Sequence, residues 1–194
     1  MALARRLQAG DMSAFAELIQ RYQDRVYNTV WRICGHAEDA RDLTQDAFLK
    51  AHQSIGSFRG QATFYTWLFR IAVNLTLSSR RAARRRGTVS LDAPLQATSG
   101  NHQASNLAAR MQDPSPHDPS DRQAATELHD QVVGALNKLD EEFRAVVVLR
   151  DMEGFDYRQI AEALGIAPGT VKSRLHRARS ALRDMLEPML APER

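Results

Sequence analysis

Residues 156–179 constrain the fold most strongly, because they combine two helical patterns with one short turn. In the first pattern, Ile160 and Leu164 lie one helical turn apart, and Gly165 can adopt the left-handed conformation that ends a helix. Pro168 suits the first turn of the next helix, where its missing N–H would have no partner. Two helices joined by so short a turn must cross and share a small core. The pattern therefore predicts a helix-turn-helix, whose second helix enters the major groove of DNA.

The second helix separates its residues by face at about 100° per residue. One face is an apolar stripe of Val171, Leu175, Ala178 and Leu182. The opposite face is polar or basic and carries Lys172, Ser173, His176 and Arg177, with Arg174 and Arg179 on its flanks. Residues 168–183 contain five lysines or arginines and no acid, whereas an ordinary solvated helix mixes both signs. This charge favours contact with phosphates and base edges, and a basic surface helix without a ligand is the alternative.

The composition favours one or two globular domains. The 194 residues are 43% hydrophobic and 25% charged, and the net charge of +3 is small but clustered. Cys34 is the single cysteine, which excludes an intramolecular disulfide and favours the cytoplasm. We expect no membrane insertion, because no apolar run approaches the ~20 residues that span a bilayer, and the N-terminus does not resemble a secretory signal.

A segment of different composition divides the chain. Residues 88–121 are rich in Ser, Pro, Asp, Asn and Gln, and contain four aspartates against one arginine. This composition predicts a flexible linker between a domain at 1–87 and a domain at 122–194. Both domains show helical periodicity and no strand alternation, so the predicted fold class is all-α, with two small helical domains. The expected helices cover residues 14–31, 37–54, a stretch from 63 onward, 124–139, 141–152, 157–164 and 168–186.

The end of the first domain is basic and aromatic. Residues 70–86 contain six arginines and no acid, which favours nucleic acid over a solvated face. With Phe64 turned inward, Tyr65 and Phe69 are expected to project to the flank and outside, where they would suit unstacked bases. The alternative is that these rings, and Trp67, pack against the preceding helices.

The acidic residues at 38–46 do not form a convincing metal site. Two of them lie in the first turn of the expected helix, where acids favour the helix dipole. Asp42 and Asp46 instead suggest a basic protein partner. We find no arrangement of residues for catalysis, and so expect no enzyme activity, cofactor, metal or small-molecule substrate.

Four segments together resemble an extracytoplasmic-function, or group IV, sigma factor of bacterial RNA polymerase. They are AFAELIQRYQDRVYN, DARDLTQDAFLKAHQSIGSFRG, FYTWLFRIAVN and LRDMEGFDYRQIAEALGIAPGTVKSRLHRAR. The resemblance covers both domains and omits the linker. SFRGQATFYTWLFRIAVN is most similar to the sigma-E type, which acts in heat and envelope stress.

The resemblance implies specific roles for the first domain, which is like sigma region 2. One set of residues would bind the beta-prime clamp helices of core polymerase: Asp39, Asp42, Leu43, Gln45, Asp46, Phe48 and Lys50. Phe58 and Asn74 match the pocket for a base flipped out of the minus-ten element. The backbone of promoter DNA would be held by Arg80, Arg81, Arg84 and Arg85.

The resemblance makes the second domain like sigma region 4. The basic face of residues 172–179 would read the minus-thirty-five element, and His176 stands where the sigma-E type has an aromatic residue. Further expected partners are the polymerase beta flap and an anti-sigma factor. The expected function is an alternative sigma factor that also promotes strand opening. The alternatives are a stand-alone helix-turn-helix regulator, which would bind a palindrome as a dimer, and a metal-dependent nucleic-acid-processing enzyme.

Overall fold

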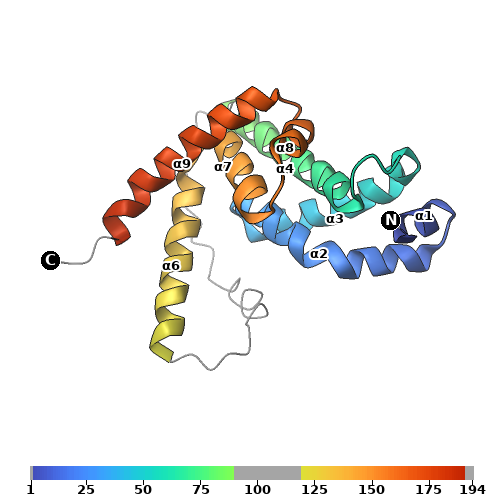
Figure 1. The fold of residues 1–194 in the computed structure, drawn as a ribbon, viewed down its shortest axis with the longest axis horizontal. Coiled ribbons are helices and arrows are strands. Elements are labelled where there is room, and N and C mark those ends of the chain that lie inside the picture. Colours follow the sequence, from blue (N-terminus) through green and yellow to red (C-terminus); the bar gives the residue numbers. More distant parts are fainter. Residues whose placement is uncertain (1, 90–118, 191–194) are drawn as a thin grey trace.

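The computed structural model describes residues 2–89 and 119–190, and every regular element in these ranges is helical. In chain order they are α1 (Ala2–Gln8), α2 (Met12–Cys34), α3 (Ala37–Ser54), the 3-10 turn η1 (Ile55–Ser57), α4 (Phe64–Val89), α6 (Pro119–Lys138), α7 (Glu141–Val147), the π-helical segment η3 (Val148–Met152), α8 (Tyr157–Leu164) and α9 (Pro168–Leu190). The predicted all-α fold is thereby confirmed for the described ranges (Figure 1). The predicted flexibility of residues 90–118 lies outside them.

The first bundle is organised around α2. The Asp11 side chain accepts a hydrogen bond from the Ser13 N–H at 2.9 Å and so caps one end of this helix. At the other end Gly35 adopts φ of 79°, and its N–H donates to the Trp31 carbonyl at 2.8 Å. Helices α1, α3 and α4 pack against α2, whose buried face includes Val26 and Val30.

The second bundle contains the predicted helix-turn-helix. Asp156 and Gln159 form a reciprocal capping box at the start of α8, and Gly165 with φ of 64° ends that helix. Helices α8 and α9 then cross over a shared core that includes Ile160 and Val171, both 0% exposed. The predicted bounds of α8 and the start of α9 are confirmed.

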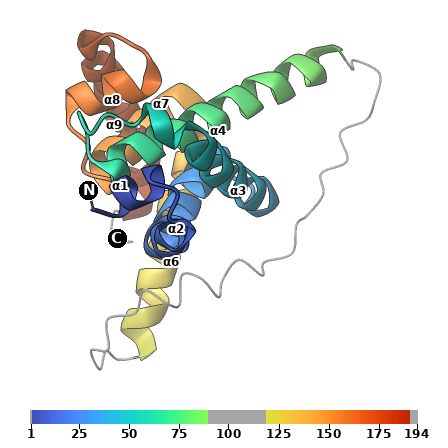
Figure 2. The ribbon, with the colours of Figure 1, turned by 90° about the vertical axis from the view of Figure 1, so that its right-hand side faces the viewer.

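The two bundles pack against each other. Helix α8 lies along α4, and α7 and η3 contact α2, so that one hydrophobic core continues from the first bundle into the second. Figure 2 shows the C-terminal part of α4 extending away from this contact, and in Figure 1 α6 lies beneath α7 and α9 and projects away from the rest of the molecule. The placement of α8 on α4 decides which predicted DNA-contact residues are accessible.

Some boundaries differ from the sequence expectation. Helix α1 was not predicted, because seven residues give too little periodicity; it is held by buried Leu7. Helix α4 continues to Val89 and α6 begins at Pro119, so both enter the predicted linker by a few residues. The division at 1–87, 88–121 and 122–194 remains a prediction.

Candidate nucleic-acid interface

The outer face of α9 presents the predicted duplex-reading residues to solvent. Val171, Leu175 and Ala178 are at most 2% exposed, and Leu182, the last member of the predicted apolar stripe, is partly buried against the same core. The residues expected to read base edges are all exposed on the other side: Lys172, Ser173, His176 and Arg177. The helical wheel therefore separated the two faces correctly, because α9 is a regular helix with one side in the core.

The two flanking arginines of this face are held by acids from the same half of the chain. Arg174 Nη2 lies 2.6 Å from Glu142 Oε2. Arg179 donates two hydrogen bonds to the Asp151 carboxylate, and this hydrogen bonding raises the pKa of Arg179. A phosphate that binds either arginine must compete with a carboxylate already in place.

The aromatic residues near the start of α4 are buried. Phe58 is 8% exposed, with its ring centroid 5.9 Å from that of Phe64 and 5.3 Å from that of Trp67. Beside them is a cavity of about 110 Å³, lined by the rings of Phe58 and Trp67 and by polar residues that include Arg70 and, from α8, Glu162. Phe58 thus lines a small cavity whose rim includes the second bundle, whereas Asn74, expected in the same base pocket, lines a different groove. The base pocket stays a prediction.

The expectation that Phe69 projects outward is wrong. Phe69 is 0% exposed, and its ring centroid lies 6.0 Å from that of Phe155, which comes from the second bundle. Tyr65 is half-buried and meets the same Phe155 ring edge-on at 5.5 Å. The alternative that these rings pack inside the protein is correct. Tyr65 packs against Tyr22 of the preceding helix α2, with 6.0 Å between ring centroids, and both Tyr65 and Phe69 contact Phe155 from far along the chain.

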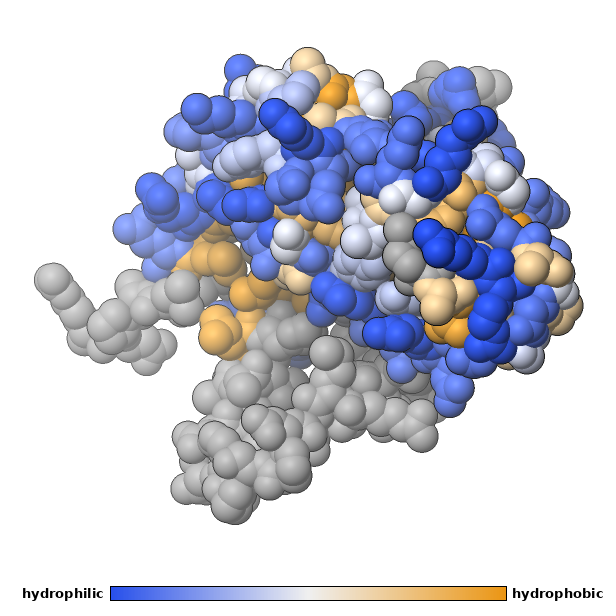
Figure 3. All heavy atoms as spheres, turned by 45° about the vertical axis from the view of Figure 1, so that its right-hand side comes forward, coloured by the Kyte–Doolittle hydropathy of each residue, from blue (hydrophilic) through white to orange (hydrophobic). Residues whose placement is uncertain are grey.

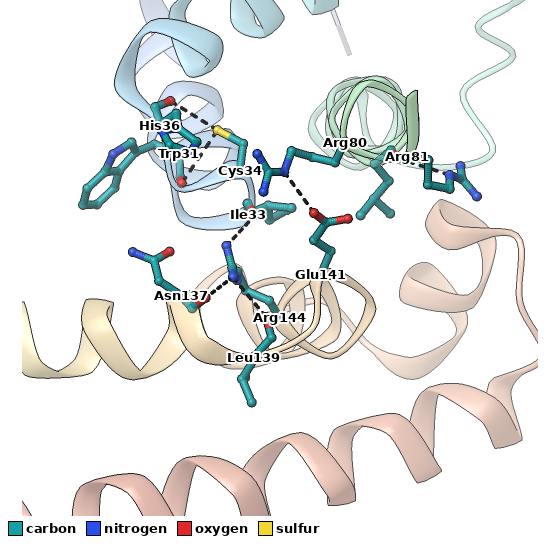
Figure 4. A network of polar contacts seen from close by, with 11 residues as sticks. Trp31, Ile33, Cys34, His36, Arg80, Arg81, Asn137, Leu139, Glu141 and Arg144 are labelled. Carbon is teal, nitrogen blue, oxygen red and sulfur yellow. Dashed lines mark hydrogen bonds and ion pairs between the residues drawn. The ribbon is translucent and has the colours of Figure 1, made fainter. Parts of the chain in front are cut away.

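The predicted backbone-contact residues on α4 occupy different environments. Asn74 is exposed, as expected, and lines a groove of about 330 Å³ between α4 and α7 that also includes Arg81 and Arg84. Arg80 is partly buried, and its Nε lies 3.0 Å from Glu141 Oε1 (Figure 4). Arg81, Arg84 and Arg85 are exposed, so this end of α4 remains a strongly basic surface.

Arg144, which the sequence pattern did not single out, is 5% exposed and joins the two bundles. Its guanidinium donates to the carbonyls of Ile33 at 3.0 Å, Asn137 at 2.6 Å and Leu139 at 3.0 Å (Figure 4). Burial lowers the pKa of Arg144, and its Nε has no hydrogen-bond partner. The available sequence indication was an arginine inside the otherwise apolar run FRAVVVL.

The predicted polymerase-binding segment presents a polar face. Its exposed members are Asp39, Asp42, Gln45, Asp46 and Lys50. Leu43 and Phe48 are 8% and 6% exposed and belong to the core, whereas Leu49, which was not predicted, is 57% exposed.

Neither a metal-binding cluster nor a membrane-spanning helix occurs among the described residues. No group of three or more His, Cys, Asp or Glu side chains lies close enough there to hold a metal ion. No helix within those ranges is both long and apolar enough to span a membrane. The face in Figure 3 is covered mainly by hydrophilic side chains, with small hydrophobic patches between them. The described surface therefore offers charged and polar groups for binding.

Comparisons with known proteins agree with this arrangement. The family model Sigma-70 region 2 matches residues 18–86, and the model Sigma-70, region 4 matches residues 129–182. The ECF RNA polymerase sigma factor SigW of Bacillus subtilis is 35% identical, over 94% of this chain and 94% of its own length. The ECF RNA polymerase sigma-E factor of Haemophilus influenzae is 34% identical, over 97% of this chain and 96% of its own.

The fold is also that of a solved structure, the sigma factor RpoE in complex with the anti-sigma factor NepR from Bartonella quintana. The TM-score is 0.67 at 24% identity, over 89% of this chain and 96% of the other. The region 2 match precedes the region 4 match in this chain, and the two sigma factors named above align with it along almost their full length. The chain therefore belongs to the sigma-70 family as an extracytoplasmic-function (ECF) member, one of the alternative sigma factors that direct RNA polymerase to promoters.

Proposed function

We propose that this sigma factor reads its promoters with two surfaces, the outer face of α9 and the exposed side of α4. The observation that carries the proposal is the exposed, acid-free face of Lys172, Ser173, His176 and Arg177 on a helix whose other side is buried. Such a face can enter the major groove of the minus-thirty-five duplex. Arg174 and Arg179 lie at its edges, where they would meet the phosphate backbone.

The α4 surface is proposed to act on the minus-ten element. Asn74 is exposed beside a strongly basic segment, so its amide can donate to and accept from the edge of an extruded base. Arg81, Arg84 and Arg85 lie further along the same helix, where they would hold the backbone. Phe58 would contribute from the aromatic cavity, and Arg80 after leaving Glu141.

The acidic face of α3 is proposed to bind the beta-prime clamp helices. Asp42 and Asp46 are exposed one helical turn apart, and neither serves an evident internal purpose. Changing both to Lys should weaken binding to core polymerase by at least about tenfold, because like charges would face a basic partner. Asp24→Lys on α2 is an exposed control that changes charge outside this face. A titration of core polymerase in which the double variant binds as well as the wild type would refute the assignment.

The promoter role has a direct test. Core polymerase with the wild-type chain should yield run-off transcripts that start at defined sites, and core polymerase alone should not. The protein is proposed to supply no catalytic step of its own and to act in the cytoplasm. A dimer of the free chain bound to a palindrome, with no transcripts from the reconstituted holoenzyme, would instead indicate a stand-alone regulator.

An anti-sigma factor is proposed as a regulatory partner. The support is the similar fold of the Bartonella quintana sigma factor, whose structure was solved in complex with one. Affinity purification of the tagged endogenous protein from unstressed cells should recover a stoichiometric partner that inhibits run-off transcription. Recovery of core polymerase alone from those cells would contradict this.

A further inference from the structure

Gln8, at the end of α1, joins this helix to a turn 47 residues later in the chain. Its Nε2 donates to the carbonyl of Ile55 at 2.9 Å and to the carbonyl of Phe58 at 2.8 Å. A primary amide carries two N–H donors, so both are used on the same turn. Both bonds end on backbone oxygens, and the effect of Gln8 therefore falls on the path of the main chain between η1 and the residues that follow it.

Buried and charged contacts hold α1 on α2. Leu7 is 4% exposed and belongs to the hydrophobic core. Arg6 Nε lies 2.8 Å from Asp11 Oδ2, and Arg6 Nη1 lies 3.2 Å from Glu17 Oε1. Exposed ion pairs stabilise little, so the burial of Leu7 contributes most to this contact. With α1 placed in this way, the Gln8 amide has a defined position from which to hold the turn.

The turn held by Gln8 leads into the wall of the aromatic cavity. The Phe58 N–H donates to the Ile55 carbonyl at 3.0 Å, so this oxygen accepts from both the turn and α1. Residues 58–63 then follow without regular structure, and residues 57–62 all line the cavity of about 110 Å³. A segment outside helices has few hydrogen bonds to fix it, so the bonds at its start affect its position strongly.

We propose that Gln8 is a positioning residue for strand opening, which holds the loop of residues 57–62 in the arrangement that receives an extruded base. The proposal rests on the proposed role of Phe58 at the minus-ten element. A pocket for such a base must return the free energy lost when the base leaves its stack. A loop that is already held in place loses less conformational freedom when the base arrives. Gln8 thus acts on base capture through the loop, without touching DNA.

Gln8→Met tests the first step in the full-length free chain, because methionine keeps the length and helix propensity of glutamine without its donors. Trp67 is 7% exposed, with its ring centroid 5.3 Å from that of Phe58, and so reports on the loop. A Trp31→Phe background leaves Trp67 as the only tryptophan. Acrylamide should quench the Trp67 fluorescence of the Gln8→Met variant about twofold faster.

The second step is tested in the holoenzyme. Permanganate reactivity of a duplex promoter should fall about threefold or more with Gln8→Met, as expected when two ordinary hydrogen bonds are lost. Binding to core polymerase should not change. Gln20→Met, at an exposed glutamine on α2, is the matched control for both measurements.

Two further variants separate the donated bonds from side-chain packing. Gln8→Lys restores N–H donors on a different shape and should recover both the slow quenching and the permanganate reactivity, with Gln20→Lys as the control for its added charge. An equal defect in Gln8→Lys and Gln8→Met would overturn the proposal. Gln8→Glu also lacks donors when ionised, and it decides if circular dichroism shows that Gln8→Met has lost its helices.

Unchanged quenching in a helical Gln8→Met variant would overturn the hold on the loop. Faster quenching with normal permanganate reactivity would overturn the link to strand opening. The proposed role of Phe58 fails separately, through normal permanganate reactivity of Phe58→Leu, which keeps an apolar side chain but removes the ring. That result would leave the quenching measurement for Gln8 unaffected.

Discussion

The two proposed DNA-binding surfaces of this sigma factor differ in how accessible they are. On α9 the central residues of the reading face are exposed, and only the flanking arginines are paired with acids. On α4 the aromatic residues are buried, Arg70 and Arg80 are paired with acids of the other bundle, and Asn74 is exposed. One surface is available in the closed chain, whereas the other is partly occupied by the chain itself.

The difference follows from what each surface would bind. Duplex DNA is always present, and a single helix offers it only a small footprint, so leaving that face exposed incurs little non-specific binding. Unpaired bases bind by stacking as well as by charge, and an exposed set of aromatic rings with arginines would also bind unrelated single strands. Covering the α4 surface until it is needed therefore favours specificity.

The largest effect is expected from Arg177→Ala, because Arg177 lies at the centre of the exposed face. If it makes a bidentate contact with a guanine, the variant should lose about 1–3 kcal/mol of binding free energy at that base pair. The preference for guanine should be relaxed at that position alone. Promoter libraries selected with the variant holoenzyme would reveal the position. Arg183→Ala, an exposed arginine later on the same helix, is the control for lost charge. An equal loss of affinity for every promoter sequence would show that Arg177 does not read a base.

The exposed residues of the α9 surface could be predicted from the sequence, whereas those of the α4 surface could not, because only the α4 surface is in contact with the other bundle. The face of Arg177 could be predicted because the periodicity of one helix contains all the information needed. The burial of Phe69 and the pairing of Arg80 could not, because they depend on Phe155 and Glu141, which approach only when the bundles dock. Family resemblance identified the segments and their order, but it carried no information about which side chains the closed chain covers.

A smaller effect is expected from Asn74→Ala. Losing a base contact should reduce open-complex formation by about 1 kcal/mol, or roughly fivefold, with little change in core binding. Permanganate footprinting of a duplex promoter measures this, and a pre-melted template should partly restore activity. Ser79→Ala, also exposed on α4, is the matched control. Normal permanganate reactivity of the Asn74 variant would show that Asn74 does not contribute to strand opening, and the two surfaces would then no longer differ in function at this residue.

The smallest effect is expected from Arg179→Ala, because Asp151 already competes for this arginine. Loss of a phosphate contact should weaken all promoters alike, by up to about 1 kcal/mol, and reduce the salt dependence of binding. Asp151→Asn should act in the opposite direction by releasing Arg179. Holoenzyme binding measured over a range of salt concentrations tests both variants, and a sequence-dependent loss for Arg179→Ala would instead class it with Arg177.

The distance between the two bundles, measured before and after core polymerase binds, tests the account most directly. Nitroxide labels at Asp24→Cys on α2 and Arg158→Cys on α8, in a Cys34→Ala background, report it by double electron–electron resonance. Both labelled positions are exposed. We predict one short distance in the free chain, replaced by a longer one in the holoenzyme as α8 leaves α4. The same short distance in an active holoenzyme would contradict the proposed role of the α4 surface at the minus-ten element, because α8 would still lie on the rim of the cavity that contains Phe58.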